Sequence, residues 1–558
     1  MQKSNTIAWN IKKIIVDALN KTFNKNNKTS LPLDFDKIFV DKVKNIELGD
    51  FTSNVLFVVD YFKDKQANSV NEFINNIDKN IFDKIEVAKN GFINFYLNNQ
   101  TKSNLLNEIC DKKDKYGFFD KKNISFNIEF VSANPTGLLH IGHARNAAYG
   151  DSLARILTAN GIKVDREYYI NDGGNQINKL ALSVLIRYLQ QFNVDVQLPD
   201  DSYHANEIIE IAKLLKEKNK DKYLHTKFDI NTQILDKDAN QEISLFAINY
   251  LLDEIKSDLA KLDVYMDIWS PESDIYKNNL VQQALTRIQK YLYDKDGAKW
   301  LKTTSFGDDK DRVLIKSDGT YTYFTPDIAY HNLKLSRGYE KIINIWGADH
   351  KSYVERMSIA IQMLGYKKTQ MYVCIMQMIS LTKNGEAFKM SKRSGDSFTT
   401  RDLVNFIGKD AARWYLVSQS LSTHINIDIE KTTKHNDENG LFYVQYAYVR
   451  IKQILKKNNL SLINKCDELT QPLEKEIINQ LFFFMPTIQN IMKSYEVHKM
   501  CLYLTNLAKH IHAYYEKVKI IDDNNKTLSG QRLFLITAAS YVIKNGLKLI
   551  GCDVKEQM

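Results

Sequence analysis

Residues 129–161 read EFVSANPTGLLHIGHARNAAYGDSLARILTANG, and this stretch decides the fold. The alternating residues 124–131 predict a strand, the segment with Pro and Gly predicts a loop, and the apolar spacing after it predicts a helix ending at Gly161. A helix start offers unpaired backbone N–H groups and a partial positive charge, so it binds anions. The stretch therefore predicts a phosphate-binding turn, with His140 and His143 on one face of the helix.

The rest of the chain extends this pattern on both sides. Up to about residue 400, β-like and helical runs alternate, which is typical of a parallel sheet covered by helices. A polar segment with the run KLLKEKNKDK interrupts the alternation and favours a helical, solvated insertion. We therefore expect a multidomain α/β protein with a small N-terminal α/β domain (1–115), a Rossmann-like parallel-sheet catalytic domain (116–435) carrying a helical insertion (about 185–255), and a C-terminal all-α helical bundle (436–558).

Composition places few limits on function. With 558 residues, 44% hydrophobic and 26% charged, the chain has the composition of a globular protein of several domains. Its net charge of +9 suits a polyanionic partner, but a general abundance of Lys and Asn explains the charge equally well. The five cysteines form no CxxC pair, so neither a structural zinc site nor a disulfide framework is expected. A signal-peptide pattern and a long apolar run are both missing from the sequence, so we expect a cytoplasmic protein without a membrane segment.

A second motif lies far downstream of the two histidines. Residues 389–393 read KMSKR and follow a predicted strand and the pair Asn384-Gly385, which favours a tight hairpin turn. Taken alone, a basic pentapeptide is usually solvated surface. A lysine that reaches a departing pyrophosphate only in the transition state raises the rate of the reaction. A mobile cationic loop is the functional interpretation.

The two motifs together resemble the signatures of class I aminoacyl-tRNA synthetases. The tetrapeptide 140–143, after NPTG, resembles the HIGH signature, and residues 389–393 resemble the KMSKS loop. The resemblance implies that adenylate formation depends on His140, Gly142, His143, Lys389, Met390, Ser391 and Lys392, and that ATP is also contacted by Pro135, Thr136 and Gly137. It implies Gly347, Asp349 and His350 on the adenosine side; alternatively, Asp349 only caps the following helix.

Other runs resemble arginyl-tRNA synthetases in particular, and the resemblance spans nearly the whole chain. They include NDGGNQINKLALSV (171–184), LDVYMDIWSPES (262–273), SDGTYTYFTPDIAYH (317–331), WGADHKSYVERM (346–357) and FYVQYAYVRI (442–451). The implied reaction joins L-arginine to ATP, which enters as its Mg²⁺ complex. Arginyl-adenylate then passes its arginine to the 3′-terminal adenosine of tRNA(Arg), releasing AMP. The resemblance also implies that tRNA binds before activation; we expect a monomer.

A guanidinium is a planar, permanent cation that suits bidentate carboxylates and an aromatic face. Asp327 and Glu272 could supply the carboxylates, although both could equally be ordinary surface or helix-capping acids. The resemblance implies that these two hold the guanidinium with Tyr323 beside it. It places Asn134 and Glu129 near the amino-acid backbone of the substrate.

In the predicted bundle, Tyr443, Tyr446 and Tyr448 could stack on anticodon bases, but an aromatic stripe at helical spacing is more often core. The sequence does not divide them between these roles. Local departures from the family pattern occur at Asn439-Gly440, at Asp263 and at residues 203–206. Three other functions remain open: a synthetase for another amino acid, a small nucleotidyltransferase, and a catalytically silent tRNA-binding paralogue.

Overall fold

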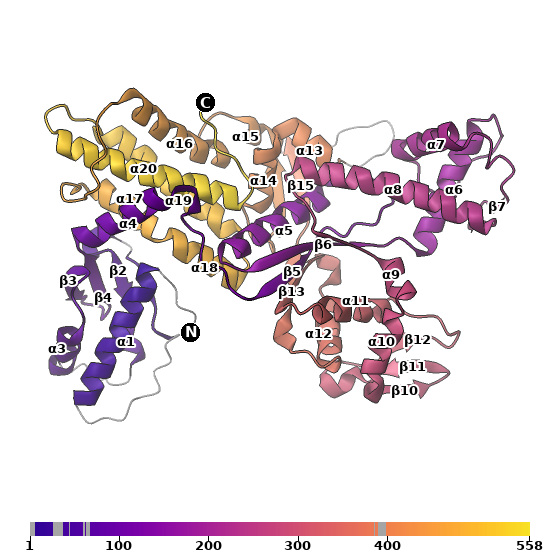
Figure 1. Cartoon of the computed structure of the whole chain (residues 1–558), viewed down its shortest axis with the longest axis horizontal. Coiled ribbons are helices and arrows are strands. Elements are labelled where there is room, and N and C mark those ends of the chain that lie inside the picture. Colours follow the sequence, from indigo (N-terminus) through magenta and orange to yellow (C-terminus); the bar gives the residue numbers. More distant parts are fainter. Residues whose placement is uncertain are drawn as a thin grey trace.

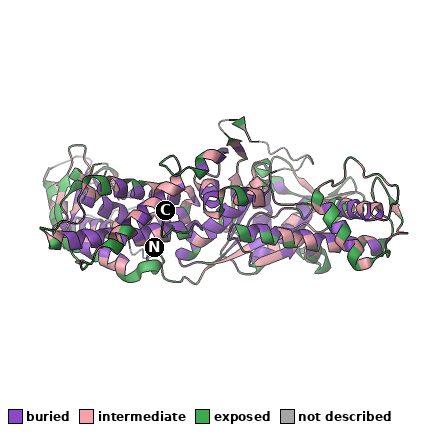
Figure 2. Cartoon of the chain, turned by 90° about the horizontal axis from the view of Figure 1, so that it is seen from above, coloured by how far each residue is buried: buried purple, intermediate pink, exposed green. Residues whose placement is uncertain are grey.

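The computed structural model describes residues 6–25, 37–43, 45–59, 62, 67–383, 386–388 and 398–558. The chain forms an elongated body in which the N-terminal unit and the insertion helices lie at opposite ends (Figure 1). Viewed from above, buried residues run along almost the whole length (Figure 2). The predicted multidomain α/β fold, with its parallel sheet, N-terminal α/β unit and C-terminal helices, is confirmed.

The N-terminal unit packs helices against a four-stranded antiparallel sheet of order β1-β2-β4-β3. On helix α1, Ile11, Ile15 and Leu19 recur at every fourth residue and are fully buried, as expected for an amphipathic helix. Its elements are α1 (Ile7–Lys25), β1 (Val40–Lys42), β2 (Phe51–Ser53), α2 (Val55–Val58), α3 (Ala67–Asn76), β3 (Phe82–Val87) and β4 (Ile93–Leu97), and α4 (Asn99–Lys112) leads out of it.

The catalytic region is built on a five-stranded parallel sheet of order β14-β13-β5-β6-β9. The strands are β5 (Ser125–Glu129), β6 (Lys163–Ile170), β9 (Ile268–Pro271), β13 (Lys341–Gly347) and β14 (Met371–Met376). Helix α5 (Ile141–Ala159) lies close to the end of β5, because a Cβ on Gly150 would lie only 2.3 Å from the ring of Phe130. Gly161 ends the turn after α5 with a φ of +81°, which favours glycine. The α5 N-terminus is thereby fixed at the carboxyl edge of the sheet.

Two excursions leave this sheet. Between β6 and β9, helices α6 (Gly174–Gln190), α7 (Asn206–Asn219) and α8 (Lys237–Lys261) and a short hairpin of β7 (Phe228–Asp229) and β8 (Gln233–Ile234) form a lobe with its own apolar core. Between α10 (Leu280–Arg287) and α11 (Phe324–Ser336), strands β10 (Leu292–Lys295), β11 (Ala298–Leu301) and β12 (Arg312–Ile315) form an antiparallel sheet. The sequence did not reveal this second excursion. Helices α9 (Glu272–Lys277) and α12 (Tyr353–Met363) complete the region.

A connecting segment joins the catalytic sheet to the bundle. It contains β15 (Ile379–Lys383), β16 (Glu386–Ala387), α13 (Thr400–Ile407), α14 (Lys409–Val417), β17 (Ile425–Asp428) and α15 (Ile429–Thr433). The bundle consists of α16 (Gly440–Lys457), α17 (Pro472–Phe482), α18 (Phe484–Ser494), α19 (His498–Lys517) and α20 (Lys526–Leu549). Helix α5 contacts α14, α18 and α20, so the bundle packs directly on the helix that carries the two histidines. Across the described part of the chain, we find no helix long and apolar enough to cross a membrane.

Candidate active site

His140 caps the start of helix α5. Its Nδ1 accepts a hydrogen bond from the backbone N–H of Gly142 at 3.0 Å, and Nδ1 of His143 accepts from the backbone N–H of His140 at 3.3 Å. The two rings stack with their centroids 3.7 Å apart. The reciprocal cap uses N–H groups that a helix start otherwise leaves unpaired. The structure therefore brings the two histidines together as one unit at the sheet edge.

Desolvation of the rings favours the neutral form of this histidine pair. Desolvation lowers the pKa of His140, and desolvation together with the neighbouring His140 lowers the pKa of His143 to about 3. Because each Nδ1 accepts a hydrogen bond, each neutral ring carries its proton on Nε2. Gly142 is needed for close approach, since a Cβ there would lie 2.8 Å from Cε1 of His140. The pair offers two neutral N–H donors rather than two cations.

The second signature, including Lys389, Met390, Ser391 and Lys392, lies outside the described residues, but the chain on both sides of it is placed. Before it, β15 and β16 pair antiparallel. After it, Thr399 forms an antiparallel bridge with His140, and the N–H of Thr400 donates to the carbonyl of Leu139 at 2.7 Å. The segment that follows the second signature is thus hydrogen-bonded to the first.

Arg145 reinforces the same connection. Its guanidinium is fully buried and donates to the carbonyls of Gln377 at 2.6 Å and Ser420 at 2.9 Å. Gln377 lies just before β15, which leads toward the second signature. An arginine with rigid, planar donors is suited to bridging several carbonyls. Helix α5 and the strand before the second signature are therefore fixed to each other.

Asp327 and Glu272 both act on one tyrosine of β6, Tyr169, and we call these two acids with this tyrosine the acidic pocket. The hydroxyl of Tyr353 donates to Oδ2 of Asp327 at 2.6 Å, and the hydroxyl of Tyr276 donates to Oε1 of Glu272 at 3.5 Å. The pKa of Tyr169 is raised first by burial and then by the charges of Glu272 and Asp327. Since both carboxylates act on Tyr169, the structure places them around the same side chain.

Burial also changes the titration of these acids. Desolvation is the largest cause that raises the pKa of Asp327, to about 6, and the charges of Glu129 and Glu272 raise it further. Desolvation raises the pKa of Glu272 as well. Clustered acids that are costly to ionise favour a cationic ligand, because its charge offsets both burial and mutual repulsion.

The two residues predicted near the amino-acid backbone have different settings. Glu129 ends β5 and is nearly buried; its Oε2 accepts from Nζ of Lys334 at 2.6 Å, and its Oε1 accepts from the hydroxyl of Ser132 at 3.1 Å. Asn134 is exposed in the loop before α5 and donates to the side chain of Gln176, on α6, at 2.6 Å. Asn134 thereby connects the loop to the insertion lobe.

Tyr323 does not join the acidic pocket in this structure. It is the N-cap of α11, and its side chain is 92% exposed. Tyr169, Tyr276 and Tyr353 are the tyrosines on which the charge of Asp327 acts. None of these three tyrosines was predicted from the sequence to line the pocket, although each lies within or beside one of the runs that resemble arginyl-tRNA synthetases.

The remaining predicted ATP contacts lie along the same sheet edge. Gly347 ends β13, and a Cβ built on it meets nothing within 4 Å, so the space above it is open. Asp349 and His350 follow in an exposed 3-10 turn. Pro135, Thr136 and Gly137 lie in the loop before α5, where a Cβ on Gly137 would be 3.5 Å from Glu207 of the insertion lobe.

A chain of buried polar groups lies beneath the pocket. Nζ of Lys334, which is fully buried, donates to Glu129 and to Oδ1 of Asn344 at 2.7 Å. Nδ2 of Asn344 contacts Nε2 of His331 at 2.9 Å, and Nδ1 of His331 contacts the carbonyl of Asp327 at 2.8 Å. Sequence reasoning missed Lys334, since lysines are almost never fully buried.

The bundle tyrosines divide into two groups. Tyr448 is only 4% exposed and belongs to the core. Tyr446 is half-buried, stacks on Phe442 with ring centroids 5.5 Å apart, and carries the guanidinium of Arg450 at 4.4 Å from its ring. Tyr443 packs against His512 with centroids 4.4 Å apart. Tyr446 and its neighbours form an aromatic and cationic ladder along α16.

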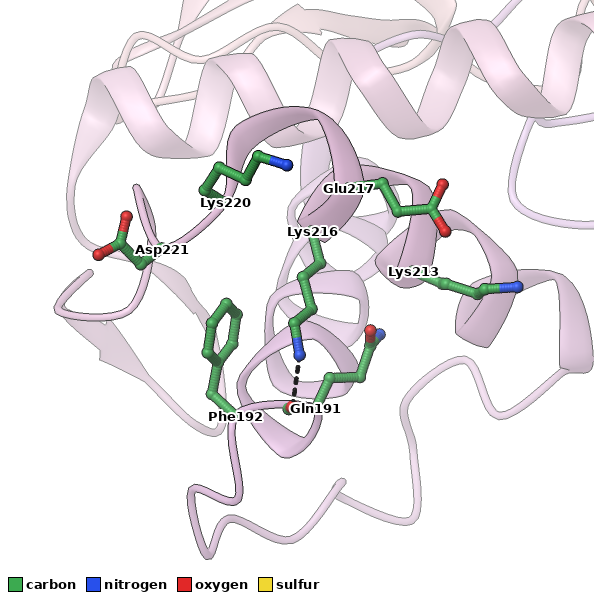
Figure 3. A pocket seen from close by; sticks show the side chains of 7 residues that line it. All are labelled: Gln191, Phe192, Lys213, Lys216, Glu217, Lys220 and Asp221. Carbon is green, nitrogen blue, oxygen red and sulfur yellow. Dashed lines mark hydrogen bonds between the residues drawn. The ribbon is translucent and has the colours of Figure 1, made fainter.

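A large hollow away from this edge lies in the insertion lobe (Figure 3). It is lined by Gln191, Phe192, Lys213, Lys216, Glu217, Lys220 and Asp221. The ammonium of Lys216 donates to the backbone carbonyl of Gln191 at 2.6 Å and lies over the ring of Phe192. None of the predicted site residues lines this hollow, so cavity size does not locate the active site.

The parallel sheet carries a histidine pair at the start of its first helix, and this helix start is hydrogen-bonded to a segment that lies beyond β15. These features together define a class I aminoacyl-tRNA synthetase. Three family models match the chain in order: "Arginyl tRNA synthetase N terminal domain" over residues 10–97, "tRNA synthetases class I (R), catalytic domain" over 105–457, and "DALR anticodon binding domain" over 444–558. The chain belongs to the arginine–tRNA ligase family.

Similar proteins cover nearly the whole chain. The arginine–tRNA ligase of Malacoplasma penetrans is 48% identical over 564 residues, covering 99% of each chain, and that of Ureaplasma parvum is 46% identical over 524 residues, covering 94% of this chain and 95% of its own. A solved arginyl-tRNA synthetase from Campylobacter jejuni has a TM-score of 0.74 at 32% identity, with 83% of this chain and 100% of that chain covered. The Thermus thermophilus arginyl-tRNA synthetase, at 19% identity and a TM-score of 0.75, covers 99% of this chain and 100% of its own and shares the fold.

Proposed function

We propose that this chain activates L-arginine with ATP and transfers it to the 3′-terminal adenosine of tRNA(Arg). The observation that carries the proposal is the convergence of three features at one sheet edge. They are the neutral histidine pair, the bridge from Thr399 to His140, and the carboxylate pocket of Asp327 and Glu272. The first two suit a nucleotide triphosphate, and the third suits a guanidinium.

In the first step, the arginine carboxylate attacks the α-phosphate of ATP, forming arginyl-adenylate and releasing pyrophosphate. ATP enters with Mg²⁺ as its substrate complex. His140 and His143 donate Nε2–H groups to the nucleotide without bringing a charge of their own. Lys389 and Lys392 neutralise charge on the leaving pyrophosphate, and the anchor at Thr399 returns their loop to the histidines.

The amino acid lies between the histidine pair and the acidic pocket. Asp327 and Glu272 bind the guanidinium, and Glu129 with Asn134 holds the amino-acid backbone. Tyr169, on which the charges of both Glu272 and Asp327 act, supplies the aromatic neighbour that we expected from Tyr323. Gly347, with open space above it, leaves room for the adenosine.

In the second step, a ribose hydroxyl of the terminal adenosine attacks the adenylate carbonyl, and AMP leaves. By resemblance to class I synthetases, we expect transfer to the 2′ hydroxyl. The ladder of Phe442, Tyr446 and Arg450 on α16 stacks on unpaired anticodon bases, while Tyr448 stays in the core. Tyr443 supports the ladder through His512.

ATP–pyrophosphate exchange tests the proposal directly. The wild-type chain is assayed with each of the standard amino acids, with and without tRNA. We expect exchange with arginine alone, and only when tRNA is present. Exchange with a different amino acid would reassign the substrate, and no exchange with any of them would favour a silent tRNA-binding protein.

A further inference from the structure

Lys334 is a buried lysine beneath the acidic pocket. Its side chain, on the third turn of α11, is fully buried, and its ammonium lies 4.5 Å from the centre of the Tyr330 ring. It donates to Oε2 of Glu129 at 2.6 Å and to Oδ1 of Asn344 at 2.7 Å. A buried ammonium is costly unless it is paired and hydrogen-bonded. Its position between catalytic strands therefore has to be explained by what it holds.

The hydrogen bonds beyond Lys334 lead to the other end of the pocket. Since Oδ1 of Asn344 accepts from Lys334, its Nδ2 donates to Nε2 of His331. The His331 ring is then protonated on Nδ1, which donates to the carbonyl of Asp327. Burial lowers the pKa of His331, so the ring stays neutral in this arrangement. Each donor in this chain of side chains therefore has an acceptor.

We propose that Lys334 is a positioning residue that holds Glu129 in its substrate-binding place and favours the charged form of Asp327, without touching the substrate itself. The inference rests on the proposed function, because it assigns these two carboxylates to the two ends of bound arginine. Lys334 donates directly to Glu129, its charge acts on the carboxylate of Asp327, and the Asn344–His331 relay connects it to the backbone carbonyl of Asp327.

The charges around Asp327 explain why a resident cation matters. Glu129 on β5 and Glu272 on α9 oppose its ionisation, and Lys334 on its own helix favours it. The hydroxyl of Tyr353 on α12 also favours the ionised form through its hydrogen bond. The phenols that face Asp327 from β6 and α9, Tyr169 and Tyr276, remain protonated because burial and the nearby carboxylates raise their pKa values. Removing Lys334 would take away the cation whose charge lowers the pKa of Asp327.

The test is the pH dependence of the arginine KM in tRNA-supported ATP–pyrophosphate exchange, from about pH 5 to about pH 9. In the wild-type enzyme, we expect KM to rise as pH falls through about 6. In Lys334→Met, we expect KM at neutral pH to rise at least about tenfold, and the midpoint of the rise to move upward by about one pH unit, with a smaller change in kcat. Lys334→Arg should restore the midpoint because it keeps the charge.

A matched control removes a different cation from the same helix. Arg337 pairs with the buried Glu167 at 2.8 Å, one turn beyond Lys334. Arg337→Met should lower the Tm but leave the arginine pH midpoint in place. If Lys334→Met does not fold, Lys334→Gln provides the neutral variant, and the same upward shift is expected.

The outcomes separate the inference from the proposed function. If Lys334→Met and Lys334→Gln lower only the Tm or kcat and keep the wild-type midpoint, Lys334 is merely structural and the inference is wrong. If Arg337→Met shifts the midpoint as much as Lys334→Met, the effect is not specific, and the inference is also wrong. If the wild-type chain shows no arginine-dependent exchange, it is the proposed function that fails.

Discussion

His143 illustrates how one position in the sequence acquires its chemistry from its surroundings. Its Nδ1 is occupied by the backbone of His140, and burial lowers its pKa to about 3. The ring is therefore a neutral donor across the physiological range, and its action should not vary with pH between about 5 and about 8. If the ring were instead positively charged, it would lose its proton as pH rises, and activity would fall over this range.

Replacing this ring should mainly affect the chemical step. His143→Ala removes one preorganised donor to the nucleotide and uncaps the N–H of His140, so we expect kcat for adenylate formation to fall by about 100- to 1000-fold. Pyrophosphate exchange at saturating arginine measures it. His498→Ala, which changes a histidine on helix α19 of the bundle, is the control. Unchanged exchange kinetics in His143→Ala would refute the role of the pair.

Asp327 leads to a prediction about arginine binding. Its pKa of about 6 means that the carboxylate loses its charge as pH falls through that value, so the arginine KM should rise below about pH 6. Asp327→Asn should raise KM by about 10- to 100-fold at neutral pH, because a charged hydrogen bond is replaced by a neutral one. It should also remove this pH dependence. An unaltered arginine KM would refute the assignment.

The same pKa has a consequence for stability. Since burial raises the folded-state pKa of Asp327 above its usual range, ionisation disfavours the folded state as pH rises from about 4 to about 6, and the penalty persists above that. Without arginine, Asp327→Asn should therefore have a higher Tm than the wild type at neutral pH and an equal one near about pH 4. Activity and stability should change in opposite directions at this residue.

At the scale of elements, the strand, loop and helix of residues 124–161 followed from the sequence, because alternation, turn residues and helical spacing are all local signals. The hairpin of β15 and β16 flanks Asn384-Gly385 as expected, with Lys383 opposite Glu386, although the turn itself lies outside the described residues. Strands β10 to β12 were missed because they are only four residues long and largely half-exposed, so they carry little periodic signal.

Two features of the site, the position of Tyr323 and the pairing of Lys334 with Glu129, could not be predicted from local sequence patterns. Tyr323 is four residues before Asp327, a spacing that places two side chains on one helix face. However, α11 begins only at Phe324, so Tyr323 lies outside the helix and points into solvent. The pairing of Lys334 with Glu129 joins residues that are 205 positions apart in the chain, and no sequence pattern encodes such a contact. Tertiary packing decides both cases.

The α13 N-terminus should transmit its stability to the catalytic loop. The side chain of Thr399 accepts a hydrogen bond from the backbone N–H of Asp402, and the side chain of Asp402 accepts one from the backbone N–H of Thr399. Thr399 also forms an antiparallel bridge with His140. Thr399→Ala should lower the free energy of unfolding by about 1 kcal/mol and reduce kcat for exchange several-fold, because the helix start that follows the second signature loses its side-chain cap. Thr399→Ser, which keeps the cap, should behave like the wild type. Full activity in Thr399→Ala would show that the anchor does not matter.

At the scale of the whole molecule, one buried ion pair joins the catalytic helix to the end of the bundle. Arg413 donates to Oδ2 of Asp151 at 2.7 Å and to the carbonyl of Ile550 at 2.8 Å, and both charged side chains are buried. Gly551, at a φ of +72°, allows this approach, because a Cβ there would lie 2.1 Å from the guanidinium. The bundle and the α5 helix therefore share a common core.

Breaking this pair should destabilise both parts together. Arg413→Met leaves Asp151 with fewer of its buried partners, so we expect the free energy of unfolding to fall by about 3 to 5 kcal/mol. Urea denaturation followed by circular dichroism measures the loss. Lys409 lies on the same helix as Arg413 and forms an ion pair with the exposed Asp553. Lys409→Met should lower the free energy of unfolding by less than about 1 kcal/mol. Equal losses in the two variants would contradict a special role for the buried pair.

The central claim is that two signatures, far apart in the chain, act on one ATP beside a pocket for arginine. A crystal structure with arginine and a non-hydrolysable ATP analogue tests it most directly. We predict that His140 and His143 and at least one of Lys389 and Lys392 contact the same nucleotide, with the guanidinium between Asp327 and Glu272. A complex in which Lys392 lies on a separate surface, or in which arginine binds elsewhere, would contradict the claim.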